Sequence, residues 1–290
     1  MPCWQGGRRH ALSLLNCQSA GEGGQEGEAS AASSYFCVVY TLKKSLGQHF
    51  LRDENMCRKI VEQVTRTPGM HLVEVGPGGG AITKYLLEWP DVDYKAIEVD
   101  EEKVVYLNKT YPAINGRIVL ADILKAEVPF SGRFSVIGNF PYNISSPILF
   151  RMLEWEQQVD EVIGMFQKEV AQRIAAGPGS KIYGILSVLM QAFFSVDYLF
   201  DVHENCFNPP PKVKSGVLRF TNLQNPHEIA DKRRFIMLVK TAFNQRRKTL
   251  RNGLKSILPA EALSDPYMDK RAEQLSVSDF VTLYKRYVER

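Results

Sequence analysis

The sequence predicts an α/β fold built on a largely parallel sheet, followed by a smaller helical region. Apolar, β-branched runs alternate with helical patterns between residues 71 and 150, which is typical of βαβ units. The first run ends in a glycine-rich turn that opens a helix, and after Thr221 only helical patterns remain. We therefore expect a tail at 1–40, an α/β domain at 41–222 and a helical domain at 223–290.

Composition narrows the class of protein. Of the 290 residues 44% are hydrophobic and 23% charged, as in ordinary globular proteins, and no apolar run reaches the ~18 residues of a membrane helix. The five cysteines form no C-x-x-C pair, which argues against a zinc site and a disulfide framework and fits a reducing compartment. We expect a cytoplasmic monomer.

The first forty residues differ from the rest. They are rich in Gly, Ser and Glu without an apolar period, so we expect disorder. Arg8 and Arg9 faintly suggest a transit peptide, but Glu22 and Glu26 do not suit one. A third alternative is that the tail is not native and that the true start lies near residues 38–42.

Each later element has its own local signal. Asp53 is a suitable cap for a helix with apolar Met56 and Ile60 at helical spacing. Strands are then expected at 71–75, 94–100, 118–120 and 134–137, with a helix opening at 81–88 after the first. Later, apolar positions at helical spacing predict two helices of the C-terminal region: Phe235, Leu238, Val239 and Ala242 in one, and Phe280, Leu283, Tyr284 and Tyr287 in the other.

The glycine-rich turn predicts a nucleotide-like ligand. Gly76 and Gly78 follow the first strand and precede a helix, an arrangement that lets a ligand approach the backbone closely. The next strand ends in Glu98, whose carboxylate suits the two hydroxyls of a ribose.

Two ligands fit this pattern, a dinucleotide such as NAD and S-adenosyl-L-methionine. The spacing G-x-G-x-G departs from the dinucleotide spacing G-x-G-x-x-G, although Ala81 is a possible substitute for the third glycine, so it favours the methyl donor. Asp122, after the third strand, is placed to accept the exocyclic amine of adenine. Alternatively, Asp122 caps the helix that follows it.

The fourth strand ends in Asn139-Phe140-Pro141-Tyr142, which matches the (Asn/Asp)-x-Pro-(Tyr/Phe) pattern of methyltransferases that act on exocyclic amines. The lone pair of such an amine is delocalised into the ring, so acceptors must draw on its protons before it attacks. Asn139 Oδ1 and a carbonyl next to Pro141 suit that task. Pro141 fixes the backbone, and Tyr142 offers a ring on which an extruded base stacks, worth ~1–3 kcal/mol.

From residue 41 to about residue 287 the chain resembles the small-subunit (16S) ribosomal RNA adenine N6-dimethyltransferases, the family whose bacterial members confer kasugamycin sensitivity. The segments that carry the resemblance stand in the family's order: LGQHFL, VEVGPGGGAIT, GNFPYNISSPILF, MFQKEVAQRIAAGPGSKIYGILSVLMQ, FNPPPKVKSGVLRF and NQRRKTLRN. The resemblance implies a Rossmann-like class I methyltransferase domain with a small C-terminal α-helical domain, using S-adenosyl-L-methionine.

The resemblance also implies site residues. The donor-binding positions fall on His49, Leu51, Gly76, Gly78, Glu98, Asp122 and Asn139. Position 49 is often Asn in relatives, and the alternative is that His49 is simply packed beside Phe50. A second aromatic wall for the base falls on Phe207, which completes the catalytic set of Asn139, Pro141 and Tyr142. For Phe207 the alternative is ordinary core packing.

Basic segments are candidates for RNA contact. Between Lys232 and Lys255 there are nine Lys or Arg and no Asp or Glu, a run dense enough to favour phosphate contact over a solvated face. The RNA-binding candidates are Lys43, Lys44, Arg246, Arg247, Lys248 and Arg251. The turn at 175–184 carries Lys181 and Tyr183, which either touch RNA or cover the edge of the fold.

The sequence thus predicts a methyltransferase that modifies the N6 amine of two adjacent adenosines in small-subunit rRNA, giving N6-dimethyladenosine during ribosome biogenesis. Three alternatives stay open: a DNA adenine methyltransferase, a binding-only assembly or transcription factor on the same fold, and a nicotinamide oxidoreductase.

Overall fold

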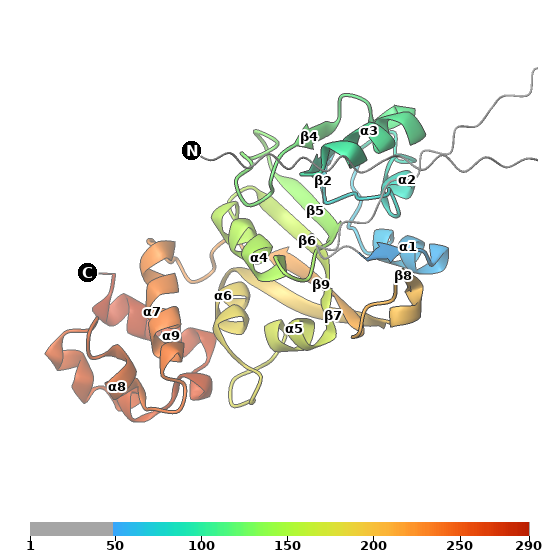
Figure 1. Ribbon diagram of the computed structural model, residues 1–290. Coiled ribbons are helices and arrows are strands. Elements are labelled where there is room, and N and C mark those ends of the chain that lie inside the picture. Colours follow the sequence, from blue (N-terminus) through green and yellow to red (C-terminus); the bar gives the residue numbers. More distant parts are fainter. Residues whose placement is uncertain (1–48, 290) are drawn as a thin grey trace, which may run out of the picture. The chain divides into compact units, whose positions relative to one another are not determined.

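The computed structural model describes residues 49–289. The predictions for the tail at 1–40 and for Lys43 and Lys44 lie outside these residues. The centre of the fold is a seven-stranded sheet with the order β4-β3-β2-β5-β6-β9-β7 (Figure 1). Its strands are β2 (His71–Val75), β3 (Asp93–Glu98), β4 (Ile118–Leu120), β5 (Phe134–Asn139), β6 (Val159–Gln167), β7 (Phe194–Val202) and β9 (Ser215–Asn222).

The sheet is parallel from β4 to β6 and becomes antiparallel where β9 lies between β6 and β7. A separate pair joins β1 (Phe50–Leu51) to β8 (Phe207–Asn208), antiparallel, with Leu51 opposite Phe207. The strand order changes direction between β2 and β5, since β3 and β4 follow on one side of β2 while β5 lies on the other. Ligands of open α/β sheets bind at such a point.

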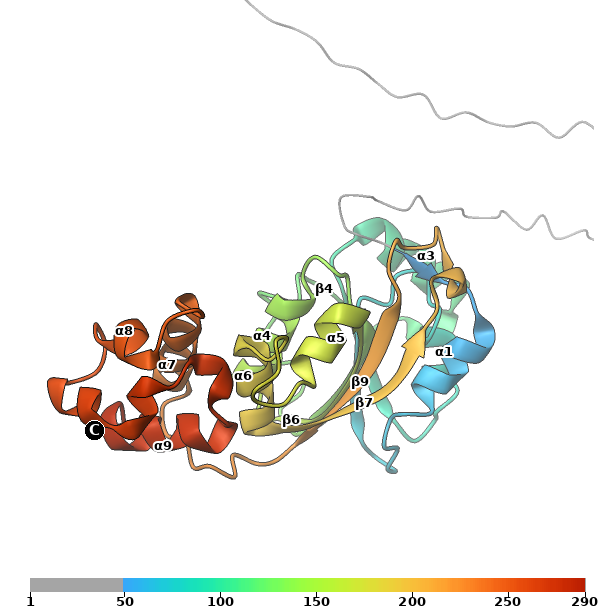
Figure 2. The same ribbon diagram turned by 90° about the horizontal axis from the view of Figure 1, so that it is seen from below.

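Helices cover both faces of the sheet (Figures 1 and 2). One group contains α1 (Glu54–Val61), α2 (Thr83–Leu86) and α3 (Glu101–Thr110); the other contains α4 (Ser145–Glu154), α5 (Lys168–Ile174) and α6 (Ile185–Phe193). The C-terminal region adds α7 (Lys232–Asn244), α8 (Leu250–Leu254) and α9 (Val277–Tyr287). Short 3₁₀ turns lie at Pro112–Ile114, Glu204–Cys206, Ala260–Ser264, Pro266–Asp269 and Ala272–Gln274.

Period-2 alternation in the strands explains the two layers. In β2, Leu72 packs in the cluster that includes α1, α2 and α3, whereas Val73 and Val75 pack in the cluster that includes α4 and α6. All three side chains are at most 2% exposed, and each contributes about 1.5–3 kcal/mol by leaving water.

Caps fix the helix starts. Asp53 precedes α1 and accepts a hydrogen bond from the Met56 N–H at 3.0 Å, as its position predicts. Asp100 caps α3 in the same way, and Ser276 forms a capping box with Asp279 on α9. Each such cap contributes about 1 kcal/mol.

The C-terminal helices pack on the sheet's own helices. Phe235 of α7 makes edge-to-face ring contacts with Phe193 of α6 and Tyr284 of α9, at centroid distances of 6.2 and 5.6 Å. These residues belong to the same apolar cluster as α4 and the sheet face beneath it. The α/β architecture with C-terminal helices is confirmed, and a domain boundary at residue 222 stays a prediction.

The predicted strands at 71–75 and 118–120 have the observed bounds. The predicted helix at 81–88 is shorter, Thr83–Leu86, and β5 extends past Ile137 to Asn139. None of the helices in residues 49–289 is both long enough and apolar enough to cross a membrane.

Candidate active site

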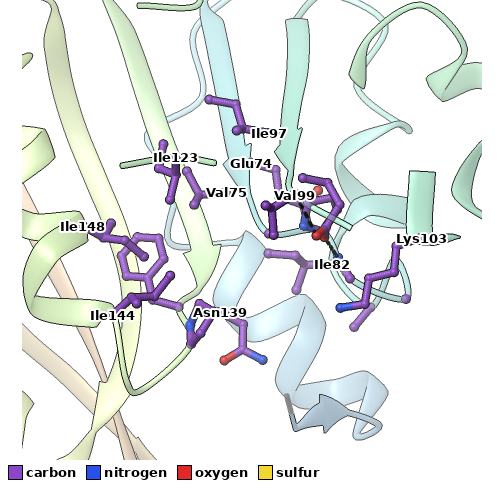
Figure 3. A pocket seen from close by; sticks show the side chains of 18 of the residues that line it. Glu74, Val75, Ile82, Ile97, Val99, Lys103, Ile123, Asn139, Ile144 and Ile148 are labelled. Carbon is purple, nitrogen blue, oxygen red and sulfur yellow. Dashed lines mark hydrogen bonds between the residues drawn. The ribbon is translucent and has the colours of Figure 1, made fainter. Parts of the chain in front are cut away.

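A cavity of about 300 Å³ lies at the carboxyl ends of β2, β3 and β5. Figure 3 shows Ile82 and Lys103 on one side of it and Ile144 and Ile148 on the opposite side. Apart from Phe207, every predicted donor-binding or catalytic residue lines it: His49, Leu51, Gly76, Gly78, Glu98, Asp122, Asn139, Pro141 and Tyr142.

The glycine turn is shaped by backbone conformations that favour glycine. Gly76, Gly78 and Gly80 have φ angles of +69°, +58° and +82°. At Gly80 a Cβ would also overlap the ring of Tyr111. The turn therefore brings bare backbone to the cavity wall.

Glu98 holds this turn in place. Its carboxylate accepts hydrogen bonds from the Gly78 N–H at 3.1 Å and from the Val99 and Asp100 N–H groups at 3.0 Å each. The side chain is 4% exposed and lines the cavity. Because a carboxylate has about four acceptor sites, one site remains for a ligand.

Glu74 is a wall residue that sequence reasoning missed. It is 1% exposed and accepts hydrogen bonds from the hydroxyls of Thr83, at 3.0 Å, and Tyr94. Burial raises the pKa of Glu74 to about 7, while the two hydrogen bonds act in the opposite direction. The available signal was a single carboxylate inside the apolar strand HLVEV.

Asp122 lines the cavity as predicted, and the alternative that it caps a following helix is wrong, because no helix begins there. Its Oδ1 accepts the Leu124 N–H at 3.0 Å in a turn and not at a helix start. The residue still lines the cavity beside Ile123 and Val99, the latter 54% exposed. Lys103, 5% exposed on α3, is a further wall residue that the sequence did not reveal.

Two glycines explain how the motif at the end of β5 is positioned. A Cβ on Gly138 or on Gly164 of the neighbouring β6 would lie 2.6 Å from ring atoms of Phe140. The Phe140 ring fills the space that these glycines leave and is 1% exposed. Phe140 is thus the buried anchor of the motif, with Asn139 and Tyr142 on the cavity side.

Asn139 and Tyr142 are fixed by neighbours distant in sequence. Asn139 donates from Nδ2 to the His49 carbonyl at 3.4 Å, and its Oδ1 accepts no hydrogen bond from the described residues. The Tyr142 hydroxyl bonds Ser215 Oγ at 2.6 Å. The His49 ring lies 5.7 Å from the Tyr142 ring and donates from Nδ1 to the Pro209 carbonyl at 2.9 Å.

Phe207 does not line the cavity. It is 1% exposed and packs with the cluster of α1 and α2. Packing, the alternative considered for this residue, describes its surroundings here, and the role as second aromatic wall stays a prediction.

The C-terminal cations divide into two kinds. Arg246 donates to the Lys181 carbonyl and lies 3.9 Å from the Glu273 carboxylate, and Arg251 pairs with Asp269 at 2.6 Å. The run itself contains no acidic residue, but these two cations find acidic partners from later in the chain, and their RNA-binding role stays a prediction. Arg247 and Lys248 are exposed and have no such partner among the described residues.

The donor side of the cavity, on β2 and β3, and the amine-binding motif at the end of β5 together define a class I methyltransferase site that acts on an exocyclic amine. The model of the family "Ribosomal RNA adenine dimethylase" matches residues 39–289. The chain belongs to this family.

Curated relatives agree along most of their length. The chain is 48% identical to Ribosomal RNA small subunit methyltransferase A of Cytophaga hutchinsonii over 245 residues, covering 83% of this chain and 95% of that one. The protein of the same name from Parabacteroides distasonis is 50% identical over 247 residues, covering 83% and 92%.

Solved structures share the fold. A dimethyladenosine transferase from Plasmodium falciparum matches with a TM-score of 0.70 at 23% identity, covering 82% of this chain and 96% of that one. The 23S rRNA methyltransferase ErmE matches with a TM-score of 0.61 at 24% identity, covering 82% and 100%.

Proposed function

We propose that this protein transfers methyl groups from S-adenosyl-L-methionine to the N6 amine of two adjacent adenosines in small-subunit (16S) rRNA, giving N6-dimethyladenosine as part of small-subunit biogenesis. The observation that carries the proposal is that Asn139 and Tyr142 line the same cavity as Gly76 and Glu98.

The cavity walls fit the donor. Gly76 and Gly78 have no side chains, so the donor can approach the backbone there. Glu98 has an acceptor site for the ribose. Asp122, beside apolar Ile123, would hold the adenine amine. When bound, the donor supplies an electrophilic methyl group on a sulfonium centre. The protein's task is then to present the amine to it.

The acceptor side holds the amine by its protons. Asn139 Oδ1 accepts no other hydrogen bond from residues 49–289, and neither does the Phe140 carbonyl, which precedes Pro141. The carbonyl of Pro141 itself is already used by the Ile144 N–H at 3.1 Å. Two acceptors on the N6 protons draw the lone pair out of the ring, and Tyr142 supports the extruded base by stacking.

The proposed substrate bears on the enzyme's compartment, its oligomeric state and its RNA-binding region. We infer that the enzyme works in the cytoplasm, where small subunits are assembled, and that it acts as a monomer, since residues 49–289 of one chain line both the donor side and the acceptor side of the cavity. We also propose that residues 223–290 form an RNA-binding domain, through Arg247 and Lys248.

Mass spectrometry of adenosines in small-subunit rRNA, from cells with and without the gene, tests the proposal. Loss of N6-dimethyladenosine at two adjacent positions is expected, and unchanged modification would overturn it. In vitro, purified protein is expected to methylate small-subunit rRNA and not duplex DNA.

A further inference from the structure

The loop between β8 and β9 is attached at both ends to the acceptor side of the cavity. At its start, the Pro209 carbonyl accepts a hydrogen bond from His49, whose ring lies 5.7 Å from that of Tyr142. At its end, the buried Ser215 bonds the Tyr142 hydroxyl at 2.6 Å. The residues between these attachments therefore stand beside the place of the target base.

Three consecutive side chains of this loop are exposed: Lys212, Val213 and Lys214. The backbone below them is held, because the Lys168 N–H donates to the Lys214 carbonyl at 2.9 Å. Lys212 has no carboxylate partner among the described residues, and Lys214 has Asp201 as a nearby charge. Val213 is 45% exposed, an apolar side chain left in solvent between two cations.

An anchored loop that presents two ammonium groups and one apolar side chain matches a nucleic-acid backbone. The two ammonium groups can bind phosphates, and the apolar side chain between them can contact a sugar or a neighbouring base. The phosphates that flank an extruded adenosine are joined to its base through the ribose, so they enter the site together with the base that stacks on Tyr142.

We infer that residues 212–214 bind the RNA backbone immediately next to the target adenosine, with Lys212 and Lys214 on phosphates. This inference rests on the proposed function. It differs from the contact proposed for Arg247 and Lys248, because in both ribbon views the loop before β9 and the helices α7 and α8 lie at opposite ends of the part drawn in colour (Figures 1 and 2).

The test compares Lys212→Ala/Lys214→Ala with Arg247→Ala/Lys248→Ala on two RNAs. One is a short hairpin that presents two adjacent adenosines in its loop, and the other is full small-subunit rRNA. A charge-matched control is Lys109→Ala/Arg117→Ala, which removes two exposed cations that do not line the cavity.

For the loop variant, affinity for both RNAs is expected to fall roughly tenfold, and the slope of log affinity against log salt by about 1.4, at about 0.7 per phosphate on a single strand. Lys212→Arg/Lys214→Arg should restore both. The Arg247/Lys248 variant should lose affinity for full rRNA and keep it for the hairpin, and the control should match the wild type on both.

A loop variant with wild-type affinity and salt slope on the hairpin would overturn the inference, as would a loss that Arg does not restore. S-adenosyl-L-methionine binding, measured by calorimetry, should stay unchanged and so reports on folding of the site. If the wild type itself failed to methylate either RNA, the proposed function would fail instead, and the two failures are distinguishable.

Discussion

The hydroxyl of Tyr142 lies 2.6 Å from Ser215 Oγ, which joins the motif at the end of β5 to the first residue of β9 across the intervening β6. Ser215 is fully buried and Tyr142 partly so, which limits the access of water to this bond. Burial raises the pKa of Tyr142, and the bond to Ser215 only partly offsets it. The phenol therefore loses its proton less readily than a free tyrosine does, and its hydroxyl is tied to β9.

Tyr142 and Ser215 should act as one unit. Tyr142→Phe and Ser215→Ala are each expected to lower the single-turnover methylation rate about fivefold, the equivalent of one neutral hydrogen bond of ~1 kcal/mol, and the double variant no further. Tyr142→Ala should lose far more because the stacking ring is gone. If Tyr142→Phe proved as inactive as Tyr142→Ala, stacking would be the wrong role for this residue.

Asn139→Ala should nearly abolish methyl transfer, because the substrate amine loses the acceptor that localises its lone pair. Labelled-methyl transfer in a single turnover measures this directly. The matched control is Asn115→Ala, an exposed amide outside the cavity wall, which should keep the wild-type rate. Substantial activity in Asn139→Ala would show that the amine needs no acceptor at this position.

Glu98 variants should weaken donor binding. Loss of a charge-assisted hydrogen bond of about 1.5–3 kcal/mol corresponds to a tenfold to 150-fold loss of affinity. Glu98→Ala also leaves three backbone N–H groups without their acceptor, so its melting temperature should fall. Glu98→Gln keeps an acceptor oxygen and separates the two effects. Calorimetry with unchanged affinity in both variants would contradict the assignment.

Glu74 should make stability depend on pH. Its pKa is raised from 4.5 to about 7 by burial, so the folded state binds its proton more tightly than the unfolded chain does. The resulting stabilisation is fully present below pH 4.5 and is lost as the pH rises through 7, a change of about 3 kcal/mol at most. Glu74→Gln should therefore gain stability relative to the wild type as the pH rises from 4.5 to 7, with little further change above that. Parallel denaturation curves for the two proteins at every pH would contradict this.

The cations of the basic run should fall into two groups, one that binds RNA and one that stabilises the fold. Arg247→Ala/Lys248→Ala should weaken binding to full rRNA and lower the salt slope, by up to about one per phosphate lost, with an unchanged melting temperature. Arg246→Ala/Arg251→Ala should lower the melting temperature, since these side chains hold the Lys181 carbonyl and Asp269. The reverse pattern, found by salt titration and thermal unfolding together, would exchange the two roles.

Local patterns sufficed for much of this fold. Strand β2 and its turn were predictable because β-branched residues run directly into glycines, and α1 because Asp53 stands one position before its helix. Asn139 and Tyr142 could be predicted as cavity residues because the motif's chemistry is contained in four consecutive residues. Such features need no knowledge of what lies across the sheet.

Long-range contacts were not predictable. Nothing in the stretch around Arg246 indicates that Glu273 will lie beside it, and nothing around Tyr142 indicates Ser215. From the sequence, Glu74 is one more residue of a strand. Only the structure shows that the hydroxyls of Thr83 and Tyr94 both donate to its carboxylate. Such contacts depend on which strands become neighbours, and a window of adjacent residues carries no information about that.

The place of β9 has a consequence for synthesis. It is the last strand of the sheet to leave the ribosome, yet it lies between β6 and β7, which are both made earlier. Until residues 215–222 emerge, the nascent chain carries two strands whose backbone groups lack their partner, and open edges of this kind invite pairing with other chains. The Tyr142 hydroxyl likewise has no Ser215 to bond until β9 has been made. A chain truncated before β9 would thus contain the donor turn and the amine-binding motif, but Tyr142 would lack the contact with Ser215.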